Sequence, residues 1–160
     1  AVYLKNVGFF MNDEMDDFAS APGKPNMFGL VQGEANAIAP GKRMLSSMTP
    51  TFMESKERVA VLGTPGGSRI INYVAKTVLA LLAWNLTPGE AVALPHFGSR
   101  NGPTELERGT EAERLQPALE ELGHAVTIQD MTSGLSLIAR RGDEWVGAAD
   151  PRREGAARGE

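Results

Sequence analysis

Residues 59–70 of the 160-residue chain read VAVLGTPGGSRI, and this stretch decides what kind of fold the sequence can form. An apolar run, a turn rich in glycine and proline, and a second apolar run predict a strand, a tight turn and a helix in succession. The turn would expose the backbone N–H groups of Gly66 and Gly67 at the positive end of the helix dipole. Such a nest stabilises an anion, either a phosphate or the oxyanion of an acyl-transfer intermediate; a plain tight turn is the alternative.

The glycines match neither of the common nucleotide-binding patterns. No lysine follows them as in GxxxxGK[ST], and their spacing departs from GxGxxG.

Three helices are predicted beyond this turn. Residues 70–84 carry apolar side chains on nearly every face, which predicts a buried helix. Thr87 and Pro88 form a helix-start signal for a short helix that stops before residue 95. Leu115, Leu119 and Leu122 form one stripe of a predicted amphipathic helix over residues 110–122, which the following glycine would end.

The remaining segments predict strands and one long loop. The loop covers residues 22–40, where Gly, Pro and Asn recur, with a short helical turn near Glu34. Strands are expected at residues 1–11 (one or two), 51–53, 58–63, 126–128, 135–140 and 144–148.

The composition is that of an ordinary globular chain, which we interpret as a single domain over residues 1–160. Hydrophobic residues make up 42% and charged residues 22%, with a net charge of −4 at pH 7. This balance excludes the basic surface of a nucleic-acid-binding protein, so no nucleic acid is expected as a partner. The chain has no cysteine, hence no thiolate metal site, and its longest apolar run, residues 78–84, is too short to span a bilayer. Its start at Ala1, without methionine or signal peptide, indicates a piece of something longer.

Residues 9–18, FFMNDEMDDF, place four carboxylates within five residues and border them with apolar side chains. The order of the acids does not match a calcium-binding loop, so no metal is expected here. Two interpretations remain: a solvated acidic turn, or a pocket that receives a positive charge.

Ser46 and Ser47 are adjacent hydroxyls in the basic stretch KRMLSSMTP, residues 42–50. Two hydroxyls can donate hydrogen bonds to a carboxylate, although a polar turn is the plainer interpretation. No histidine stands at a spacing that suggests activation of either serine as a nucleophile. His96 and His124 are interpreted as structural.

Trp84 and Trp145 are interpreted most simply as core residues.

Together these signals are complementary. An acidic patch suits an ammonium, paired hydroxyls suit a carboxylate, and an N–H nest suits an oxyanion. An α-amino acid carries the first two charges, and its side-chain amide develops the third when it is attacked.

Four stretches give the chain a close resemblance to the small subunit of γ-glutamyltransferases. They are MNDEMDDF (residues 11–18), PGKPNMFGLVQGEANAIAPGKRMLSSMTP (22–50), LGTPGGSRII (62–71) and GAADPRREGAA (147–157). The resemblance implies an α+β fold, the αββα four-layer sandwich of the N-terminal-nucleophile hydrolases, shared with a large subunit cut from the same precursor. It also implies that the chain contributes part of that sandwich.

The resemblance also implies roles for individual residues. In the acidic block, which contains Asn12, the residues that hold the α-ammonium of the γ-glutamyl group would be Glu14 and Asp17, lying against apolar walls. The residues that bind its α-carboxylate would be Ser46 and Ser47. The backbone of Gly66 and Gly67 would form the oxyanion hole, and residues 22–33 would form a lid loop. Phe28 stands in that loop where many bacterial members have tyrosine, which puts a lid hydrogen bond in doubt.

The activity implied is transfer of a γ-glutamyl group, through a γ-glutamyl-enzyme intermediate, from glutathione and related donors to water or to amino-acid or peptide acceptors. The nucleophile would be an N-terminal threonine with its own α-amine as base, and Ala1 has no hydroxyl, so the attacking group is expected outside this chain. No cofactor is implied, and the location implied is periplasmic or extracellular. Two alternatives stay open: a cephalosporin or glutaryl acylase of the same superfamily, and a non-catalytic γ-glutamyl-binding homologue.

Overall fold

The computed structural model describes residues 2–26 and 29–159, which form two compact units, Ala1–Ser46 and Ser47–Glu160. The first unit consists mainly of turns. Its regular elements are a small antiparallel hairpin, β1 (Tyr3–Leu4) and β2 (Phe9–Phe10), and two 3₁₀ helices, η1 (Glu14–Asp17) and η2 (Glu34–Asn36). The two short strands near the start of the chain and the turn near Glu34 are therefore as predicted.

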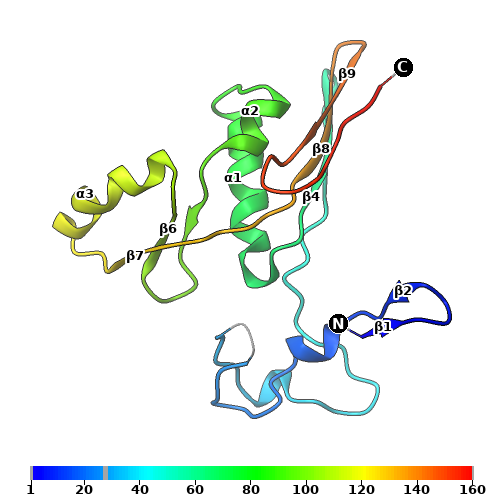
Figure 1. The fold of residues 1–160 in the computed structure, drawn as a ribbon, viewed down its shortest axis with the longest axis vertical. Helices are drawn as coiled ribbons and strands as arrows, with labels where there is room; N and C mark the ends of the chain where they lie inside the picture. Colours follow the sequence, from blue (N-terminus) through cyan, green and yellow to red (C-terminus); the bar gives the residue numbers. More distant parts are fainter. Residues whose placement is uncertain (1, 27–28, 160) are drawn as a thin grey trace. The chain divides into compact units, whose positions relative to one another are not determined.

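A four-stranded antiparallel sheet is the frame of the second unit (Figure 1). Its order is β3 (Thr51–Glu54), β4 (Arg58–Gly63), β8 (Ser136–Arg141) and β9 (Glu144–Ala149). The strands predicted at these four places are confirmed to within two residues at either end.

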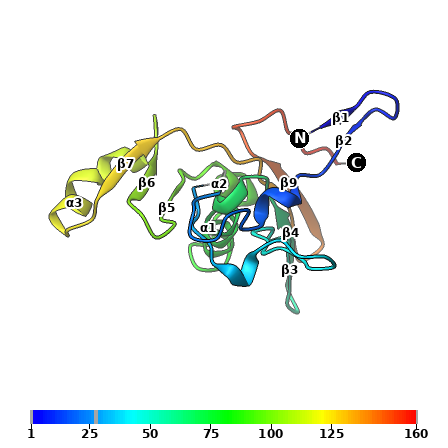
Figure 2. The same cartoon turned by 90° about the horizontal axis from the view of Figure 1, so that it is seen from below.

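Two helices, α1 (Ile70–Leu82) and α2 (Pro88–Ala93), cover one face of this sheet (Figures 1 and 2). The predicted start of α2 is confirmed, because Thr87 and Glu90 form a reciprocal capping box. The core lies between helices and sheet, where alternate strand residues meet the inward stripe of each helix. Its buried members are Ala60, Leu62, Ile70, Val74, Ala80, Leu81, Ala91, Val92, Leu135, Leu137 and Ala139.

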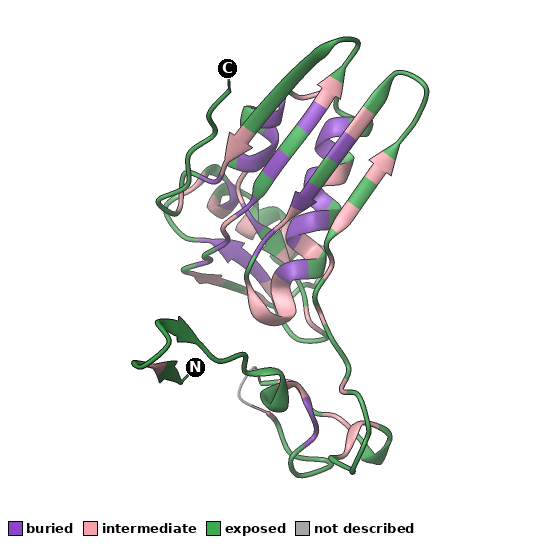
Figure 3. Cartoon of the chain, turned by 90° about the vertical axis from the view of Figure 1, so that its right-hand side faces the viewer, coloured by how far each residue is buried: buried purple, intermediate pink, exposed green. Residues whose placement is uncertain are grey.

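The opposite face of the sheet is open and partly apolar within the second unit. Strand register aligns Phe52, Val61 and Ile138 in one row across it, and all three are about half exposed or more. The alternation of buried and exposed residues along each strand is visible in Figure 3. One face of this sheet is thus covered by helices while the other presents apolar side chains.

A smaller sheet lies on the far side of the helices from the four-stranded sheet (Figures 1 and 2). It contains β5 (Phe97–Gly98), β6 (Thr104–Glu107) and β7 (Val126–Gln129), with β6 and β7 parallel. Between these two strands run η4 (Glu111–Leu115) and α3 (Gln116–Glu121). The strand β7 was predicted, whereas β5 and β6 were not.

Three predictions about side-chain environment are wrong. The helical segment predicted over residues 110–122 is present as η4 followed by α3, but its leucine stripe is not a packed face: Leu115 and Leu122 are exposed and Leu119 is partly buried. Pro117 explains the break, because it has no N–H to continue the α-helical pattern into the preceding turn. Trp84 and Trp145 are about half exposed and not core residues, and α1 is buried along one side only.

No helix among the described residues has the length and apolar character to cross a membrane.

Candidate active site

The Gly66–Gly67 turn joins β4 to α1 and has the backbone that a nest requires. Gly66 has φ of 155° and Gly67 has φ of 57°, conformations that residues with a Cβ rarely adopt. Gly67 opens the 3₁₀ helix η3 (Gly67–Arg69), which runs directly into α1. The first N–H groups of a helix have no partner within it, so the turn can present donors together with the positive end of the helix dipole. The predicted strand–turn–helix is confirmed.

Two arginines and one glutamate fix the residues immediately after this turn. Arg69 donates two hydrogen bonds to the Glu105 carboxylate, at 2.7 Å from Nε and 3.0 Å from Nη2. Arg100 donates to the same carboxylate at 2.6 Å and to the hydroxyl of Ser68 at 2.9 Å. Burial alone would raise the pKa of Glu105, but the hydrogen bonds from both arginines outweigh it and hold the pKa at about 2. Glu105 therefore remains charged and anchors η3 to β6.

The acidic turn lies in the first unit, as the helix η1. Asp17 is half-buried next to the buried Phe18, whereas Asn12 and Glu14 are exposed. The prediction that Glu14 lies against apolar walls is therefore not met within this chain. Burial, and then the carboxylates of Asp13, Glu14 and Asp16, raise the pKa of Asp17. A positive charge placed beside Asp17 would relieve this repulsion.

Asn36, which no sequence pattern singled out, ties the acidic turn to the chain just before the serines. Its side-chain amide donates to the backbone carbonyl of Asp17 at 2.7 Å, and its side-chain oxygen accepts from the backbone N–H of Leu45 at 2.8 Å. The same amide donates to Gln32, and the backbone carbonyl of Asn36 accepts from Ala19 at 2.9 Å. One residue thus sets the separation between Asp17 and the segment that leads into Ser46.

The predicted serines lie at the boundary of the two units, Ser46 at the end of the first and Ser47 at the start of the second. The carbonyl of Ser47 accepts a hydrogen bond from the Thr49 hydroxyl at 2.8 Å. Phe28, the predicted lid residue, lies outside the described residues. The structure therefore places Asn12, Glu14 and Asp17 in one unit and the glycine turn in the other.

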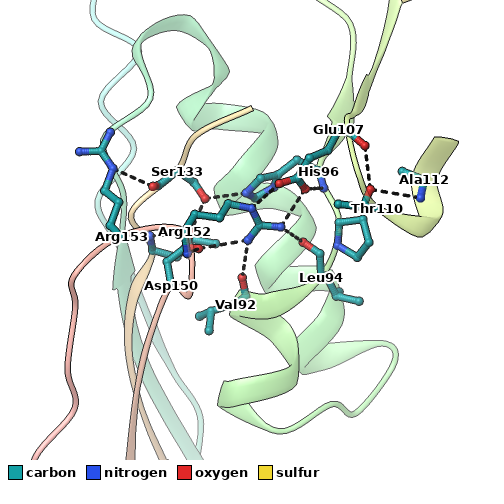
Figure 4. A network of polar contacts seen from close by, with 12 residues as sticks. Val92, Leu94, His96, Glu107, Thr110, Ala112, Ser133, Asp150, Arg152 and Arg153 are labelled. Atoms are coloured by element: carbon teal, nitrogen blue, oxygen red, sulfur yellow. Dashed lines mark hydrogen bonds and ion pairs between the residues drawn. The ribbon is translucent and has the colours of Figure 1, made fainter. Parts of the chain in front are cut away.

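A series of hydrogen-bonded polar residues, most of them buried, crosses the second unit (Figure 4). Lys76 on α1 contacts His96 Nδ1 at 2.8 Å, and His96 Nε2 contacts the Ser133 hydroxyl at 2.6 Å. The Ser133 hydroxyl donates in turn to Asp150, and the Asp150 carboxylate also accepts from Arg152 at 3.1 Å. The interpretation of His96 as structural agrees with its complete burial, while His124 is exposed.

These hydrogen-bonded residues are not arranged as a nucleophilic triad. In a Ser–His–Asp triad the carboxylate holds the histidine nitrogen that faces away from the serine. Here a lysine occupies that nitrogen, and the carboxylate contacts the serine instead. Burial, followed by the charges of Lys76 and Arg152, lowers the pKa of His96 to about 3, so the imidazole is neutral at pH 7 and unsuited to accept a proton.

The network also includes the C-terminal motif at residues 147–157. Arg152 donates from Nη2 to the Glu107 carboxylate at 2.8 Å and to the Leu94 carbonyl at 3.0 Å. Across residues 2–26 and 29–159, no cluster of three or more His, Cys, Asp and Glu side chains has the arrangement to hold a metal ion.

Comparison with known proteins places these features in a family. The family described as Gamma-glutamyltranspeptidase matches residues 1–160. The chain is 40% identical to the glutathione hydrolase proenzyme of Pseudomonas sp. (strain A14) and 41% identical to that of Escherichia coli (strain K12). These alignments cover 95% and 91% of this chain but only 29% and 26% of the relatives, so the chain spans less than a third of their length.

Solved structures give the same result for the fold. The gamma-glutamyltranspeptidase from Pseudomonas nitroreducens complexed with L-DON superimposes with a TM-score of 0.88 at 34% identity, over 99% of this chain and 86% of that one. The transpeptidase CapD of Bacillus anthracis (18% identity, TM-score 0.68) and a cephalosporin acylase from Bacillus halodurans (23%, 0.65) share the fold alone. The predicted α+β, N-terminal-nucleophile-hydrolase class is confirmed. The chain belongs to the gamma-glutamyltranspeptidase family.

Proposed function

We propose that this chain is the substrate-recognition and oxyanion-stabilising part of an enzyme that transfers γ-glutamyl groups. The donor is glutathione or a related γ-glutamyl compound, and the acceptor is water, an amino acid or a peptide. A threonine hydroxyl from outside these 160 residues attacks the γ-carbonyl carbon, and the C–N bond breaks as the leaving amine takes a proton. Attack by water or an amine on the resulting γ-glutamyl ester then releases the product and restores the hydroxyl.

The observation that carries the proposal is the Gly66–Gly67 turn. Its positive φ values, its place at the start of α1 and its anchoring through Arg69 and Glu105 make it a fixed N–H nest. As the γ-carbonyl carbon becomes tetrahedral, its oxygen gains negative charge and the two N–H groups stabilise that charge. Donors held rigidly in place need no reorganisation during the reaction, which makes this kind of stabilisation effective.

Recognition of the donor rests on the acidic turn and the serine pair. Glu14 and Asp17 hold the α-ammonium, with Asn12 beside them, and the raised pKa of Asp17 supports a place for a positive guest. Ser46 and Ser47 donate to the α-carboxylate. Residues 22–33, including Phe28, close over the bound donor as a lid.

The open face of the four-stranded sheet supports a large subunit from the same precursor as the partner. A contiguous apolar face of this kind marks an interaction surface, and in a two-sheet sandwich it packs against the inner face of a second sheet. Phe52, Val61 and Ile138 form the row that the second sheet covers. The completed heterodimer acts in the periplasm or outside the cell.

The test is release of cysteinylglycine by the longer protein that contains this chain. Purified protein and a Gly67→Ala variant are assayed side by side with glutathione and with its glutaryl analogue, which lacks the α-amino group. We expect the parent protein to prefer glutathione over the glutaryl analogue, and Gly67→Ala to act on glutathione about a hundred- to a thousandfold more slowly. Preference for the glutaryl analogue would indicate an acylase, and binding of glutathione without turnover would indicate a non-catalytic homologue; either result would overturn the proposal.

A further inference from the structure

The backbone of the glycine turn rests on a buried aromatic ring. A Cβ added to Gly66 would come within 2.8 Å of the Tyr73 ring, closer than real Cβ atoms approach a neighbour. Tyr73 lies one turn into α1 and is 1% exposed. Any displacement of this ring would therefore move the turn directly, since packed interiors transmit shifts and do not absorb them.

His96 packs against the same ring. The centroids of the Tyr73 and His96 rings are 4.0 Å apart with an angle of 34° between their planes, and His96 is fully buried. The turn thus contacts the tyrosine ring, and the tyrosine ring contacts the histidine. The position of the imidazole therefore sets how close the tyrosine lies to the turn.

The imidazole is fixed at both of its nitrogens. Lys76 Nζ also donates to the carbonyls of Leu94 and Pro95, at 2.7 Å and 3.2 Å. An ammonium has no acceptor, so His96 Nδ1 accepts from Lys76 and the ring proton lies on Nε2. The Nε2–H group donates a hydrogen bond to the Ser133 hydroxyl, and this hydroxyl donates a hydrogen bond to the Asp150 carboxylate. The lysine at one end of this hydrogen-bonded series and the carboxylate at the other therefore determine which group donates in each of its hydrogen bonds.

The same hydrogen-bonded series also fixes the segment before the turn. The N–H of Gly134, next to Ser133, donates to the Thr64 hydroxyl at 2.9 Å, and the Ser133 carbonyl accepts from Arg153 at 2.8 Å. Thr64 is two residues before Gly66. The turn is therefore fixed before Gly66 through Ser133 and beneath Gly66 through His96 and Tyr73.

We propose that His96 is a positioning residue for the oxyanion hole, acting on Gly66 and Gly67 through the ring of Tyr73. The inference rests on the proposed function, in which those two N–H groups stabilise the developing oxyanion. His96 touches neither substrate nor reacting atoms. Through its contact with Tyr73 it fixes the position of the Gly66–Gly67 backbone, and the hydrogen bonds to Lys76 and Ser133 fix the orientation of the imidazole ring.

This role predicts a specific kinetic signature. Displacing an oxyanion donor weakens transition-state binding while leaving the contacts to the bound ground state intact. Misplacement of catalytic groups by about 1 Å can cost about a hundredfold in rate. His96→Gln in the longer protein is therefore expected to lower kcat by about 10- to 100-fold and to change the inhibition constant of glutamate by less than about twofold.

Tyr73 variants test the route of the effect. Tyr73→Phe keeps the ring and should retain kcat within about threefold, whereas Tyr73→Leu should lower it about as much as His96→Gln. The double variant His96→Gln/Tyr73→Leu should lose no more than the larger single loss, because both changes release the same support. If the two losses multiply instead, His96 does not act through Tyr73 and the proposal is overturned.

Hydrogen exchange separates this inference from the proposed function. The amides of residues 64–69 should exchange at least about tenfold faster in His96→Gln than in the parent protein, while those of α2 stay unchanged. Ser133→Ala, a milder change that leaves the imidazole in place, should shift exchange and kcat in the same direction. A parent protein without γ-glutamyl turnover would refute the proposed function while exchange still tests the positioning. Unchanged exchange at residues 64–69 in a folded His96→Gln protein would overturn the inference.

Discussion

At the scale of single residues, the chemistry we propose depends on Gly67 more than on any charged side chain. Its φ of 57° lies in the left-handed region, so an alanine there is strained and also places a methyl group beside the N–H that we propose faces the oxyanion. We expect Gly67→Ala to lower kcat by about a hundred- to a thousandfold, equivalent to about 3–4 kcal/mol of transition-state stabilisation. Steady-state kinetics with glutathione, and inhibition by glutamate, measure the two sides of the effect.

Gly63→Ala is the matched control for this change. It lies on β4 before the turn, and a Cβ there meets no atom within 4 Å. Its kcat should stay close to that of the parent protein. An equal loss of glutamate affinity in Gly67→Ala would show that the turn shapes the donor pocket and does not stabilise the oxyanion.

Asn36 is the second residue whose loss should be specific, in this case to binding. Asn36→Ala removes the hydrogen bonds to the Asp17 carbonyl and the Leu45 N–H, each with a net value of about 1 kcal/mol. We expect KM for glutathione to rise about 10- to 30-fold, because the ammonium and carboxylate sites lose their fixed separation. The exposed Asn6 provides the control variant Asn6→Ala. A fall in kcat with unchanged KM would contradict the role given to Asn36.

Site residues that belong to a short local sequence pattern could be predicted from the sequence, and residues that act through partners distant in the sequence could not. The paired glycines and the crowded carboxylates are visible within a few positions. Asn36, Glu105 and His96 each have a partner far away in the sequence, at separations of 19, 36 and 37 residues, which no local pattern reveals. Glu105 in particular looks like a surface charge until the fold brings two arginines to it.

At the scale of elements, the lysine on α1 and the histidine before β5 predict an acid sensitivity of folding. The buried His96 has its pKa lowered from 6.5 to about 3, so the unfolded chain binds a proton that the folded chain excludes between these values. The contribution of His96 to stability is therefore complete above pH 6.5 and is lost as the pH drops through this window. Between pH 7.5 and pH 5 we expect a loss of about 2 kcal/mol from this group, measured by urea unfolding.

His124→Gln and His96→Gln provide the comparison for this prediction. Glu105 and Asp150 have lowered pKa values and lose their protons well below pH 5, so they contribute little in this window. The exposed His124→Gln variant should show the full decrease in unfolding free energy between pH 7.5 and pH 5, and the His96→Gln variant should show only a small part of that decrease. Equal pH dependence in the two variants would contradict the assignment to His96.

Elements with a clear period and clear ends were predictable, and those that depend on tertiary partners were not. The capping box at Thr87 and Glu90 fixed the start of α2. By contrast, β6 carries two glutamates that are buried only because Arg69, Arg100 and Arg152 neutralise them, so its sequence does not look like a strand of a buried sheet. The leucine stripe of residues 110–122 had the period of a packed helix, yet Leu115 and Leu122 remain more than half exposed.

At the scale of the whole molecule, we expect the open sheet face to control assembly. Ile138→Lys places a charge at one end of the apolar row, where desolvation on docking is costly. We expect the longer protein with this change to lose association of its two subunits, measured by size-exclusion chromatography. Leu122→Lys, the same kind of change at a more exposed leucine just after α3, should assemble normally. Normal assembly of Ile138→Lys would place the partner elsewhere.

The central claim is that the protein recognises a γ-glutamyl group by its α-ammonium, and a ratio of two rates tests it most directly. The measurement is kcat/KM for glutathione relative to its glutaryl analogue, in the parent protein, in Asp17→Asn and in the exposed neighbour Asp13→Asn. Removing one partner of a desolvated charge pair costs about 2–5 kcal/mol, so Asp17→Asn should lower kcat/KM for glutathione by about 30-fold or more. The account predicts a strong preference for glutathione in the parent protein and in Asp13→Asn, and loss of that preference in Asp17→Asn. A preference that changes by less than about threefold in Asp17→Asn would contradict it.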